Sequence, residues 1–359
     1  MPMLRGRIAV APLLAVAGLT MTCLDRNGRS EVVFPPEGTA LDSTGSRPRV
    51  YAADSLHLVV QVGGRSDQDT TLLNPYIMAA DEGGVYLFET ENRILRFDTT
   101  GARLWVRGRA GGGPGEYRNP RDMKVGPGGE LWLVDPDAGR VTVLETATGK
   151  LRRSISMRVP YSPMITPLQH GFVLYPNDLA QHMFYFDAAG AVVRTDTIPW
   201  AGFRALDFLS KGLRTAVDPK TGIWVLGFIY GNGWFAFDTN GQGTARRYYV
   251  EPTRFPPVIR ERFPNGDIGT KLVRTVGSAL DLDLRGDTVF VLFDGEAPDR
   301  RRKLDMYSWK TGNYLGSLRL PEPVDDIGLC GRYLAAYSSR PVPKLAFYLR
   351  EKTIAARQN

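Results

Sequence analysis

Four aspartates near the strands expected at the centre of the fold are the side chains best suited to hold a cation. They are Asp122, Asp281, Asp325 and Asp326. Calcium prefers several oxygen ligands, so these carboxylates could form a calcium site if the fold brings them together. They could instead pair with Arg121 or accept hydrogen bonds from backbone amides at strand ends. The sequence leaves both alternatives open.

The three histidines do not indicate a second kind of metal site. Such a site needs several imidazoles that converge. His57 falls in an expected outer strand and His170 in a turn at the opposite end of the fold, so they should lie apart; His182 is the third. The sequence also has no Ser-His-Asp order and no paired-cysteine motif. The glycines at 111–115 are not followed by the Lys-Ser of a phosphate-binding loop.

The composition is that of a globular protein that can bury a core. Of 359 residues, 43% are hydrophobic and 23% are charged. The formal net charge is +7, but the lysines and arginines are scattered among acidic residues and form no stripe. We therefore expect no nucleic-acid partner, and we expect a monomer.

The N-terminus has the pattern of an export signal. Arg5 and Arg7 precede an apolar run at residues 8–21, and Cys23 follows. The run is too short and too near the N-terminus to predict a membrane span. We expect an exported protein that resides in the periplasm or on the outer surface.

Two processing outcomes compete at this signal. The Ala-Val-Ala sequence at 15–17 fits ordinary cleavage after Ala17, whereas residues 19–23 (Leu-Thr-Met-Thr-Cys) resemble a bacterial lipobox. A cysteine that ends a signal sequence has few other uses. The favoured prediction is a lipid anchor on Cys23.

Internal repetition is the strongest pattern in the chain. Six short apolar runs, each with an aromatic residue, start about 41–66 residues apart; they are 85–88, 131–134, 172–175, 223–226, 289–292 and 333–336. A second run follows each of them after about 12–18 residues; these runs are 97–101, 144–149, 186–190, 237–241, 307–312 and the degenerate 347–349. Two markers that stay in step six times indicate six structural repeats.

Each repeat reads as a small sheet of short strands. The first run is apolar at consecutive positions, which predicts a strand buried on both faces. The second run, in all but the last repeat, ends in a turn that leads into another strand. One such sheet alone would leave two apolar faces in water, and stacking six of them around an axis buries both. The sequence therefore predicts an all-β, six-bladed β-propeller.

The two ends of the chain are expected to close this ring. After residue 347 too little chain remains for a full outer strand, and residues 56–62 could supply it. We predict that this N-terminal strand completes the sixth blade. The predicted order is a signal peptide (1–22), a flexible tether (23–49), the propeller (50–350) and a C-terminal tail (351–359).

Residues 108–120 and 131–144 resemble an NHL repeat. The first segment is a glycine-rich loop with an aromatic and a proline, and the second contains a strand that ends at Asp135 and a strand that begins at Arg140. Residues 92–97 of the first blade match more loosely. The resemblance implies a bacterial six-bladed propeller lipoprotein related to NHL-repeat proteins. Members of this superfold bind proteins, RNA or sugars, and a minority are lactonases or lyases.

Propeller topology places two kinds of loop on one face, where ligands usually bind: the loop that enters each inner strand and the loop between the second and third strands. On this face we expect a partner to be bound by Arg121, Asp122, Tyr161, Asn177, Asn232 and Asp325. The insertion at 251–269 belongs to the same face and either caps the channel or is a family-specific addition. The basic run at 300–303 is expected to be a solvated loop tip.

The function that these patterns favour is non-enzymatic. We expect a cell-envelope binding or scaffold module that presents its loop-rich face to a protein or glycan and contacts the membrane only through its lipid anchor. No catalytic residue and no obligatory cofactor are predicted. The alternative is a calcium-dependent lactonase, hydrolase or lyase of the NHL-like or gluconolactonase-like propeller type, built on the four aspartates.

Overall fold

The structure is a computed structural model. It describes the chain in the ranges 30–33 (backbone only), 48–52, 56–157, 163–175, 182–198, 212–244, 246–251, 253–263, 265–273 and 276–350. The predicted signal peptide, Cys23 and the predicted C-terminal tail lie outside the described residues.

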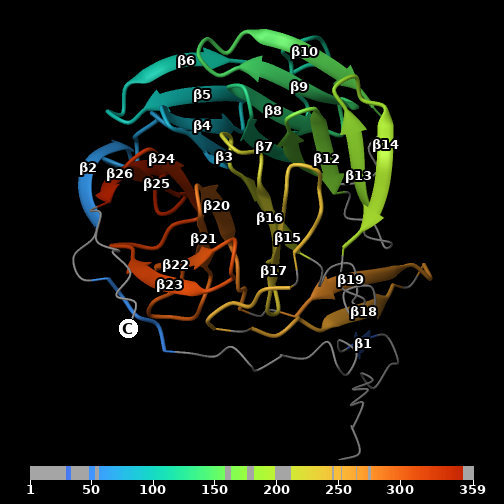
Figure 1. Ribbon diagram of the computed structural model, residues 1–359, viewed down its shortest axis with the longest axis vertical. Coiled ribbons are helices and arrows are strands. Elements are labelled where there is room, and N and C mark those ends of the chain that lie inside the picture. The colour runs from blue at the N-terminus through green and yellow to red at the C-terminus, as the bar shows by residue number, and fades with distance from the viewer. Residues whose placement is uncertain are drawn as a thin grey trace, which may run out of the picture.

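All but three of the described strands form six small antiparallel sheets around a central axis, which confirms the predicted six-bladed β-propeller (Figure 1). From the channel outward, blade 1 consists of β3 (Pro75–Asp81), β4 (Gly84–Glu89), β5 (Arg93–Asp98) and β6 (Arg103–Arg107). Blade 2 consists of β7 (Asp122–Gly126), β8 (Glu130–Asp135), β9 (Arg140–Glu145) and β10 (Leu151–Ser156). Blade 3 consists of β11 (Met164–Leu168), β12 (Gly171–Tyr175), β13 (His182–Asp187) and β14 (Val192–Thr197). Blade 4 consists of β15 (Leu213–Val217), β16 (Trp224–Phe228) and β17 (Trp234–Phe237). Blade 5 consists of β20 (Asp281–Arg285), β21 (Thr288–Phe293), β22 (Lys303–Ser308) and β23 (Tyr314–Arg319). Blade 6 consists of β24 (Asp326–Cys330), β25 (Tyr333–Ser338), β26 (Lys344–Arg350) and β2 (Leu56–Gly63).

The two repeated apolar runs of the sequence are the second and third strands of the blades. Every residue of β4, β12 and β16 is buried, because these strands have a neighbouring blade on each face. The core is divided into six apolar clusters, and each cluster fills the space between two adjacent blades. Large aromatics span these interfaces, as where Trp132 of blade 2 lies 5.5 Å from Phe172 of blade 3. Burial of each such side chain stabilises the fold by roughly 1.5–3 kcal/mol.

The N-terminal strand closes the ring, as predicted. β2 pairs antiparallel with β26, with Leu56 opposite Arg350 and Val62 opposite Leu345 (Figure 1). Val62 is buried in the cluster between blades 6 and 1. The N-terminal strand that leads into blade 1 is therefore hydrogen-bonded into blade 6, and this pairing closes the ring.

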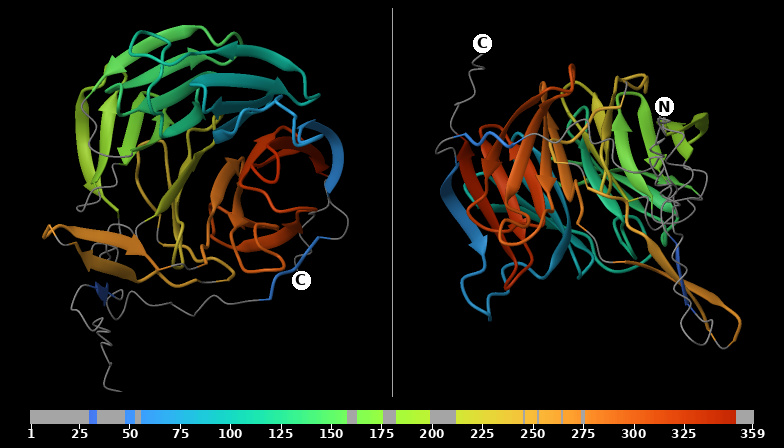
Figure 2. Two further views of the ribbon diagram at one scale, coloured as in Figure 1. Left: turned by 180° about the vertical axis from the view of Figure 1, so that it is seen from behind. Right: turned by 90° about the horizontal axis from the view of Figure 1, so that it is seen from below.

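Blade 4 is the least regular blade, and the chain that follows it leaves the ring. Instead of a fourth strand, isolated bridges at Gly243 and Arg247 pair with β17. The insertion before blade 5 forms an antiparallel hairpin of β18 (Val258–Arg262) and β19 (Ile268–Leu272), to which β1 (Ser30–Val33) adds a third strand. This hairpin projects from the rim of the ring (Figure 2). None of its residues lines the central cavity described below.

The described residues just before β2 are also bound to the propeller. The Arg49 guanidinium forms two 2.8 Å hydrogen bonds to the carboxylate of Asp305 in β22 and a contact with Glu251. Tyr51 forms a parallel bridge with Ser317. This part of the segment predicted as a tether therefore lies along blade 5.

The described residues contain no α-helix. Accordingly, this part of the chain includes no helix with the length and apolar character needed to cross a membrane.

Candidate functional site

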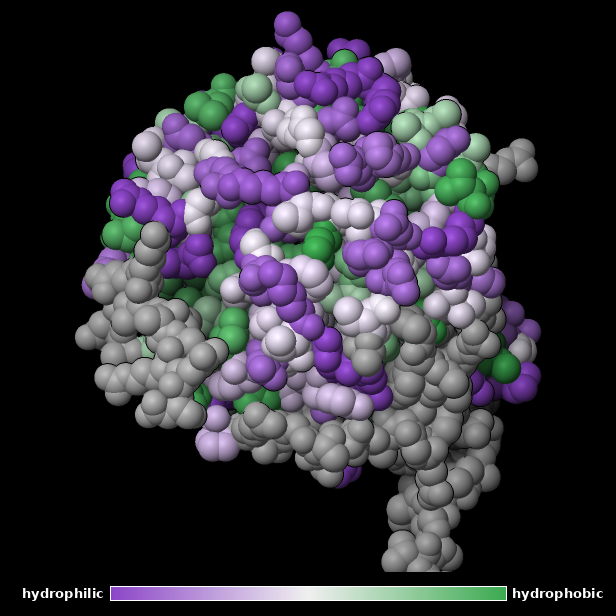
Figure 3. Space-filling view, viewed as in Figure 1, coloured by the Kyte–Doolittle hydropathy of each residue, from purple (hydrophilic) through white to green (hydrophobic). Residues whose placement is uncertain are grey.

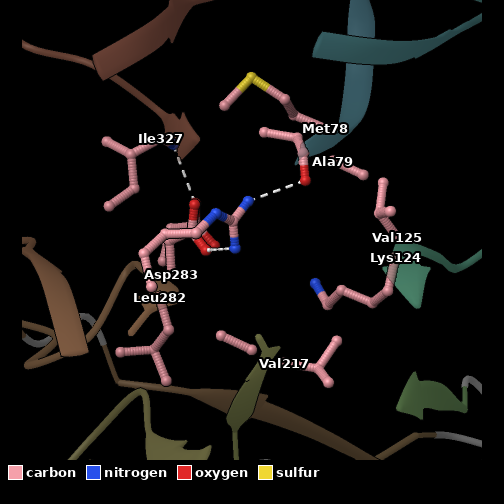
Figure 4. A pocket seen from close by; sticks show the side chains of 12 residues that line it. Met78, Ala79, Lys124, Val125, Val217, Leu282, Asp283 and Ile327 are labelled. Carbon is pink, nitrogen blue, oxygen red and sulfur yellow. Dashed lines mark hydrogen bonds and ion pairs between the residues drawn. The ribbon is translucent and has the colours of Figure 1, made fainter. Parts of the chain in front are cut away.

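The inner strands bring charged side chains together at a small cavity in the centre of the ring (Figure 4). The cavity has a volume of 30 Å³ and is lined by residues of β3, β7, β15, β20 and β24. Its charged lining residues are Lys124, Asp281, Asp283 and Arg285. A space of this size holds about two water molecules, so it does not accommodate a metabolite as it stands.

Asp122 and Lys124 occupy alternate positions of β7. Asp122 Oδ2 accepts a hydrogen bond from the backbone N–H of Ile165 in β11 at 3.0 Å, which ties blade 2 to blade 3. Lys124 Nζ lies 3.2 Å from Asp122 Oδ1, and its ammonium group points into the cavity (Figure 4). Burial alone would lower the pKa of Lys124, but the Asp122 and Asp281 carboxylates raise it above its ordinary value. Lys124 is therefore a fixed positive charge in the channel.

Two aspartates of β20 hold the neighbouring inner strand in register. Asp281 Oδ2 accepts the backbone N–H of Ile327 at 2.9 Å, and Asp283 Oδ2 accepts that of Leu329 at 2.6 Å. Both donors belong to β24. Burial raises the pKa of each carboxyl above its ordinary value. The two side chains together connect blade 5 to blade 6.

Two arginines extend these connections. Arg285 Nη1 lies 2.7 Å from Asp283 Oδ1, and its Nη2 donates a 2.8 Å hydrogen bond to the carbonyl oxygen of Ala80 in β3. Arg285 thus reaches from blade 5 to blade 1. Arg214 Nε donates to the carbonyl oxygen of Leu280 at 2.7 Å, which links blade 4 to blade 5. The channel charges therefore act as links between inner strands.

Asp326, at the start of β24, has a carboxyl whose pKa is raised by its surroundings. Burial and the neighbouring Asp281 carboxylate raise the pKa of Asp326 to about 7. Arg214 and Lys124 oppose that shift but do not cancel it. Near neutral pH the channel therefore exchanges a proton at Asp326.

Three of the four aspartates considered as calcium ligands have hydrogen-bond partners within the described structure. Asp122 and Asp281 each use an oxygen to accept a backbone amide, and the Lys124 ammonium neutralises Asp122. Asp325 accepts the backbone N–H of Ser339 at 2.7 Å. No three His, Cys, Asp or Glu side chains among the described residues form a group that could hold a metal ion. The carboxylates that calcium would need as ligands serve as hydrogen-bond acceptors within the fold.

The residues predicted for the partner-binding face have different surroundings. Arg121 is exposed, and its backbone N–H donates to Val134. Asn232 is buried, and its Oδ1 accepts the backbone N–H of Tyr249 at 2.8 Å. The remaining members of the set are Asp122 and Asp325, described above, and Tyr161 and Asn177, which lie outside the described residues. The four described residues belong to blades 2, 4 and 6, and of these Arg121 and Asp122 are adjacent in the sequence.

The basic run at 300–303 is engaged in ion pairs and is not a purely solvated tip. Arg300 Nε and Arg301 Nε lie 3.1 and 3.0 Å from Asp294 Oδ1, and Arg301 also contacts Asp325. Asp294 in turn accepts the backbone N–H of Gly277, which leads to β20. These charges hold two loops of blades 5 and 6 together.

The NHL-like segment is a structural unit in its own right. The Asp135 carboxylate accepts the backbone N–H groups of Arg118 and Asn119 at 2.7 and 3.2 Å. Arg140 Nη1 and Nη2 donate to the carbonyl oxygens of Gly112 and Glu116 at 3.0 and 2.6 Å. The residues that carry the resemblance therefore fold the loop that enters β7.

Sequence reasoning missed Lys124, Arg214, Asp283 and Arg285. A signal for two of them was present, because residues 281–285 read Asp-Leu-Asp-Leu-Arg. In a strand, alternate side chains share a face, so this pattern predicts a charged face toward the channel. Lys124 repeats the pattern two residues after Asp122.

The face turned toward the viewer in Figure 1 is covered mainly by hydrophilic residues. Its hydrophobic residues occur in separate small groups among the atoms that are not drawn in grey (Figure 3). A partner bound there would meet a predominantly polar surface.

Two curated proteins are similar to part of the chain. NHL repeat-containing protein 3 of Homo sapiens is 26% identical over 103 residues, which are 26% of this chain and 30% of that protein. The Mus musculus protein of the same name is 28% identical over 124 residues, 31% of this chain and 36% of that protein. The chain thus spans about a third of the length of these relatives. No protein-family model matches the sequence. The partial similarity supports an NHL-related propeller.

Three solved structures match the chain at low sequence identity and with TM-scores below 0.5. Virginiamycin B lyase from Staphylococcus aureus has a TM-score of 0.49 and 11% identity, and the match covers 82% of this chain and 100% of that one. The Cps50 (Swd1) β-propeller domain from Myceliophteria thermophila has a TM-score of 0.47 and 11% identity, with coverage of 82% and 100%. Raptor from Chaetomium thermophilum has a TM-score of 0.49 and 14% identity, with coverage of 83% and 29%. Likeness at this level concerns the fold and does not extend to activity.

Proposed function

We propose that this chain is a non-enzymatic binding or scaffold module of the cell envelope. It is exported, held by a lipid on Cys23, and presents the loop-rich face of the propeller to a protein or glycan partner. The observation that carries the proposal is the filled channel, whose charged side chains bind one another and the backbone of adjacent blades.

The state of the channel favours binding over catalysis. A catalytic pocket needs a concave space in which polar groups converge on a substrate. Here the central cavity measures 30 Å³, and Asp122, Asp283 and Arg285 are each occupied by links between strands. The surface available to a partner is therefore formed by the loops around the channel mouth.

A pair of exposed positions on opposite faces tests the proposal. Arg121 precedes an inner strand on the loop-rich face, and His170 lies in the β11–β12 turn on the other face; both are exposed. A photo-crosslinking amino acid at position 121 should give a specific adduct in the native envelope. The same group at position 170 is the matched control and should not.

Two outcomes would refute the proposal. Adducts that form equally from positions 121 and 170 would show no preference for the loop-rich face. Calcium-dependent hydrolysis of a lactone by the purified chain, lost in Asp122→Asn but kept in a folded Arg121→Gln control, would establish the enzymatic alternative.

A further inference from the structure

Blades 4 and 5 are neighbours in the ring (Figure 1), and a groove separates their outer ends. The described part of blade 4 has three strands where each of the other blades has four. Residues 246–250 form the blade 4 wall of the groove, and Tyr307 with residues 311–314 forms the blade 5 wall. The volume is 280 Å³, and none of the lining residues lines the central cavity. Small-molecule sites begin at about 300 Å³, so the groove suits a small ligand.

Four tyrosines make the lining of this groove mainly aromatic. Tyr248 lies on the blade 4 side and Tyr314 on the blade 5 side, and both are half-buried. Tyr249 and Tyr307 also line the groove, and each is 1% exposed. The ring centroids of Tyr249 and Tyr307 are 6.3 Å apart, and those of Tyr307 and Tyr314 are 5.7 Å apart. A row of contacting rings thus leads from the interior to the surface, so the aromatic wall is already formed without a ligand.

Tyr314 is held in place by hydrogen bonds at its hydroxyl. The Tyr314 hydroxyl lies 2.6 Å from Ser317 Oγ, and it accepts the backbone N–H of Val50 at 3.1 Å. The N-terminal segment and β23 therefore fix the orientation of this ring. Because the hydroxyl is already hydrogen-bonded, Tyr314 contributes its ring to the groove.

Polar side chains that can donate hydrogen bonds complete the lining. Arg247 Nη2 donates to the carbonyl oxygen of Lys310 at 3.0 Å, whereas Arg247 Nη1 has no hydrogen-bond partner among the described residues. Gly312 lies so close to Arg247 that a Cβ at position 312 would collide with the arginine side chain, so this contact positions the guanidinium. Thr311 and Asn313 are exposed at the same turn, and the described residues leave the Asn313 side-chain amide unbonded. The groove therefore retains donors for a ligand beside its aromatic rings.

We propose that this groove binds a short oligosaccharide. A sugar ring has C–H groups on its faces and hydroxyls around its edge. The rings of Tyr248 and Tyr314 pack against the C–H faces, and Arg247 Nη1 and the Asn313 amide hydrogen-bond to the hydroxyls. A proline-rich segment also docks on aromatic grooves, but it advances about 3 Å per residue and would run beyond a groove of this size.

The groove is separate from the loop-rich face. Its blade 5 wall includes the β22–β23 turn at 311–313. In a propeller, turns between third and fourth strands lie at the opposite end of the blade from the loops that enter the inner strands. A saccharide bound here is therefore a second contact of the chain, and the inference does not rest on the proposed function.

An array of defined neutral and uronate-containing oligosaccharides tests the groove directly. The unlipidated chain from Leu24 onward is applied to the array, and the saccharide that binds best is then titrated by calorimetry. Tyr248→Ala and Arg247→Gln should each raise its Kd by about tenfold or more. Asn313→Ala, at an exposed position, should raise the Kd by at least about threefold, whereas Tyr314→Phe keeps the ring and should change it by less than about threefold.

The matched controls are an arginine and a tyrosine outside the groove. Arg107 of β6 is exposed and, like Arg247, donates to a backbone carbonyl, that of Val106 at 2.8 Å. Tyr76, next to the loop that enters β3 on the loop-rich face, is 45% exposed. Arg107→Gln and Tyr76→Ala should leave the Kd unchanged. Circular dichroism melting verifies that each variant folds.

Four results would overturn the proposal. The first two are an array on which the unsubstituted chain binds no saccharide, and equal binding by folded Tyr248→Ala and Arg247→Gln. The third is binding lost in Tyr76→Ala but kept in the groove variants, which would assign the saccharide to the loop-rich face. The fourth is a proline-rich decapeptide that binds in place of the saccharides and is lost in Tyr248→Ala. Failure here leaves the crosslinking from position 121 unaffected, and failure of that crosslinking leaves the array result unaffected.

Discussion

Replacement of Asp326 by asparagine should stabilise the propeller, and by more at alkaline pH than at acid pH. Its pKa is raised from 3.8 to about 7 by burial and by the Asp281 carboxylate. Between these two pH values the folded chain keeps the proton that the unfolded chain has released. The free energy of unfolding therefore falls as pH rises from about 4 to about 7, and the loss is complete above pH 7.

The size of the effect follows from the shift. A rise of roughly three units corresponds to about 4 kcal/mol, because each unit is worth about 1.4 kcal/mol. Asp326 is partly exposed, so solvent screens part of this shift. We therefore expect Asp326→Asn to be more stable than the unsubstituted chain by about 2–4 kcal/mol at pH 8 and by about 1 kcal/mol or less at pH 4.5.

Urea unfolding followed by tryptophan fluorescence measures both values, since the chain has six tryptophans. Asp122→Asn is the control. It weakens the partner of the Lys124 ammonium at 3.2 Å, so it should destabilise the chain at pH 8. A loss of stability in Asp326→Asn at pH 8, or a difference that does not change with pH, would refute the assignment of the proton to Asp326.

Three further predictions concern the contacts that hold the N-terminal segment and blade 6 in place. Arg49→Met removes the guanidinium that pairs with the Asp305 carboxylate, and Asp305 is 1% exposed. We expect this change to lower the free energy of unfolding, measured by urea titration, by about 3–5 kcal/mol. A loss below about 1 kcal/mol would contradict the role of this pair. Val62→Asp places a charge in the cluster between blades 6 and 1 and should cost at least about 3 kcal/mol, whereas Val59→Asp at the exposed neighbouring position should cost less than about 1 kcal/mol by the same measurement. Burial raises the pKa of the Cys330 thiol, so it should resist a soluble thiol reagent in the folded chain from Leu24 and react after unfolding; rapid reaction of the folded chain would show that blade 6 opens.

The fold was predictable because its main determinants are periodic in the sequence. Runs such as 85–88 and 131–134 are apolar on both faces, and only a sheet with neighbours on both sides buries them. Ring closure followed from the strand at 56–62 and the short C-terminal remainder. The hairpin of β18 and β19 was not predicted, although the Asn265-Gly266 pair between residues 258–262 and 268–272 is a hairpin signal.

The candidate site was harder to predict than the fold. Whether Asp122 binds calcium or a backbone amide depends on the distance between β7 and β11, which sequence spacing does not give. Asn232 was expected at a surface because it lies in a loop, yet it is buried where it holds the chain at Tyr249. Lys124 and Arg285 were overlooked because the sequence does not show what each side chain contacts in the ring: Lys124 lies 3.2 Å from Asp122 of the same strand, and Arg285 donates to Ala80 of blade 1.

The N-terminal part of the chain is attached to the body at three successive places: β1 on the β18–β19 hairpin, Arg49 on blade 5 and β2 on blade 6. A mechanical pull on the N-terminus would reach these attachments in that order. The strand that closes the ring would bear tension last, after the β1 pairing and the Arg49–Asp305 pair had given way. The β1 pairing and the Arg49–Asp305 pair would therefore break before the β2–β26 pairing that closes the ring.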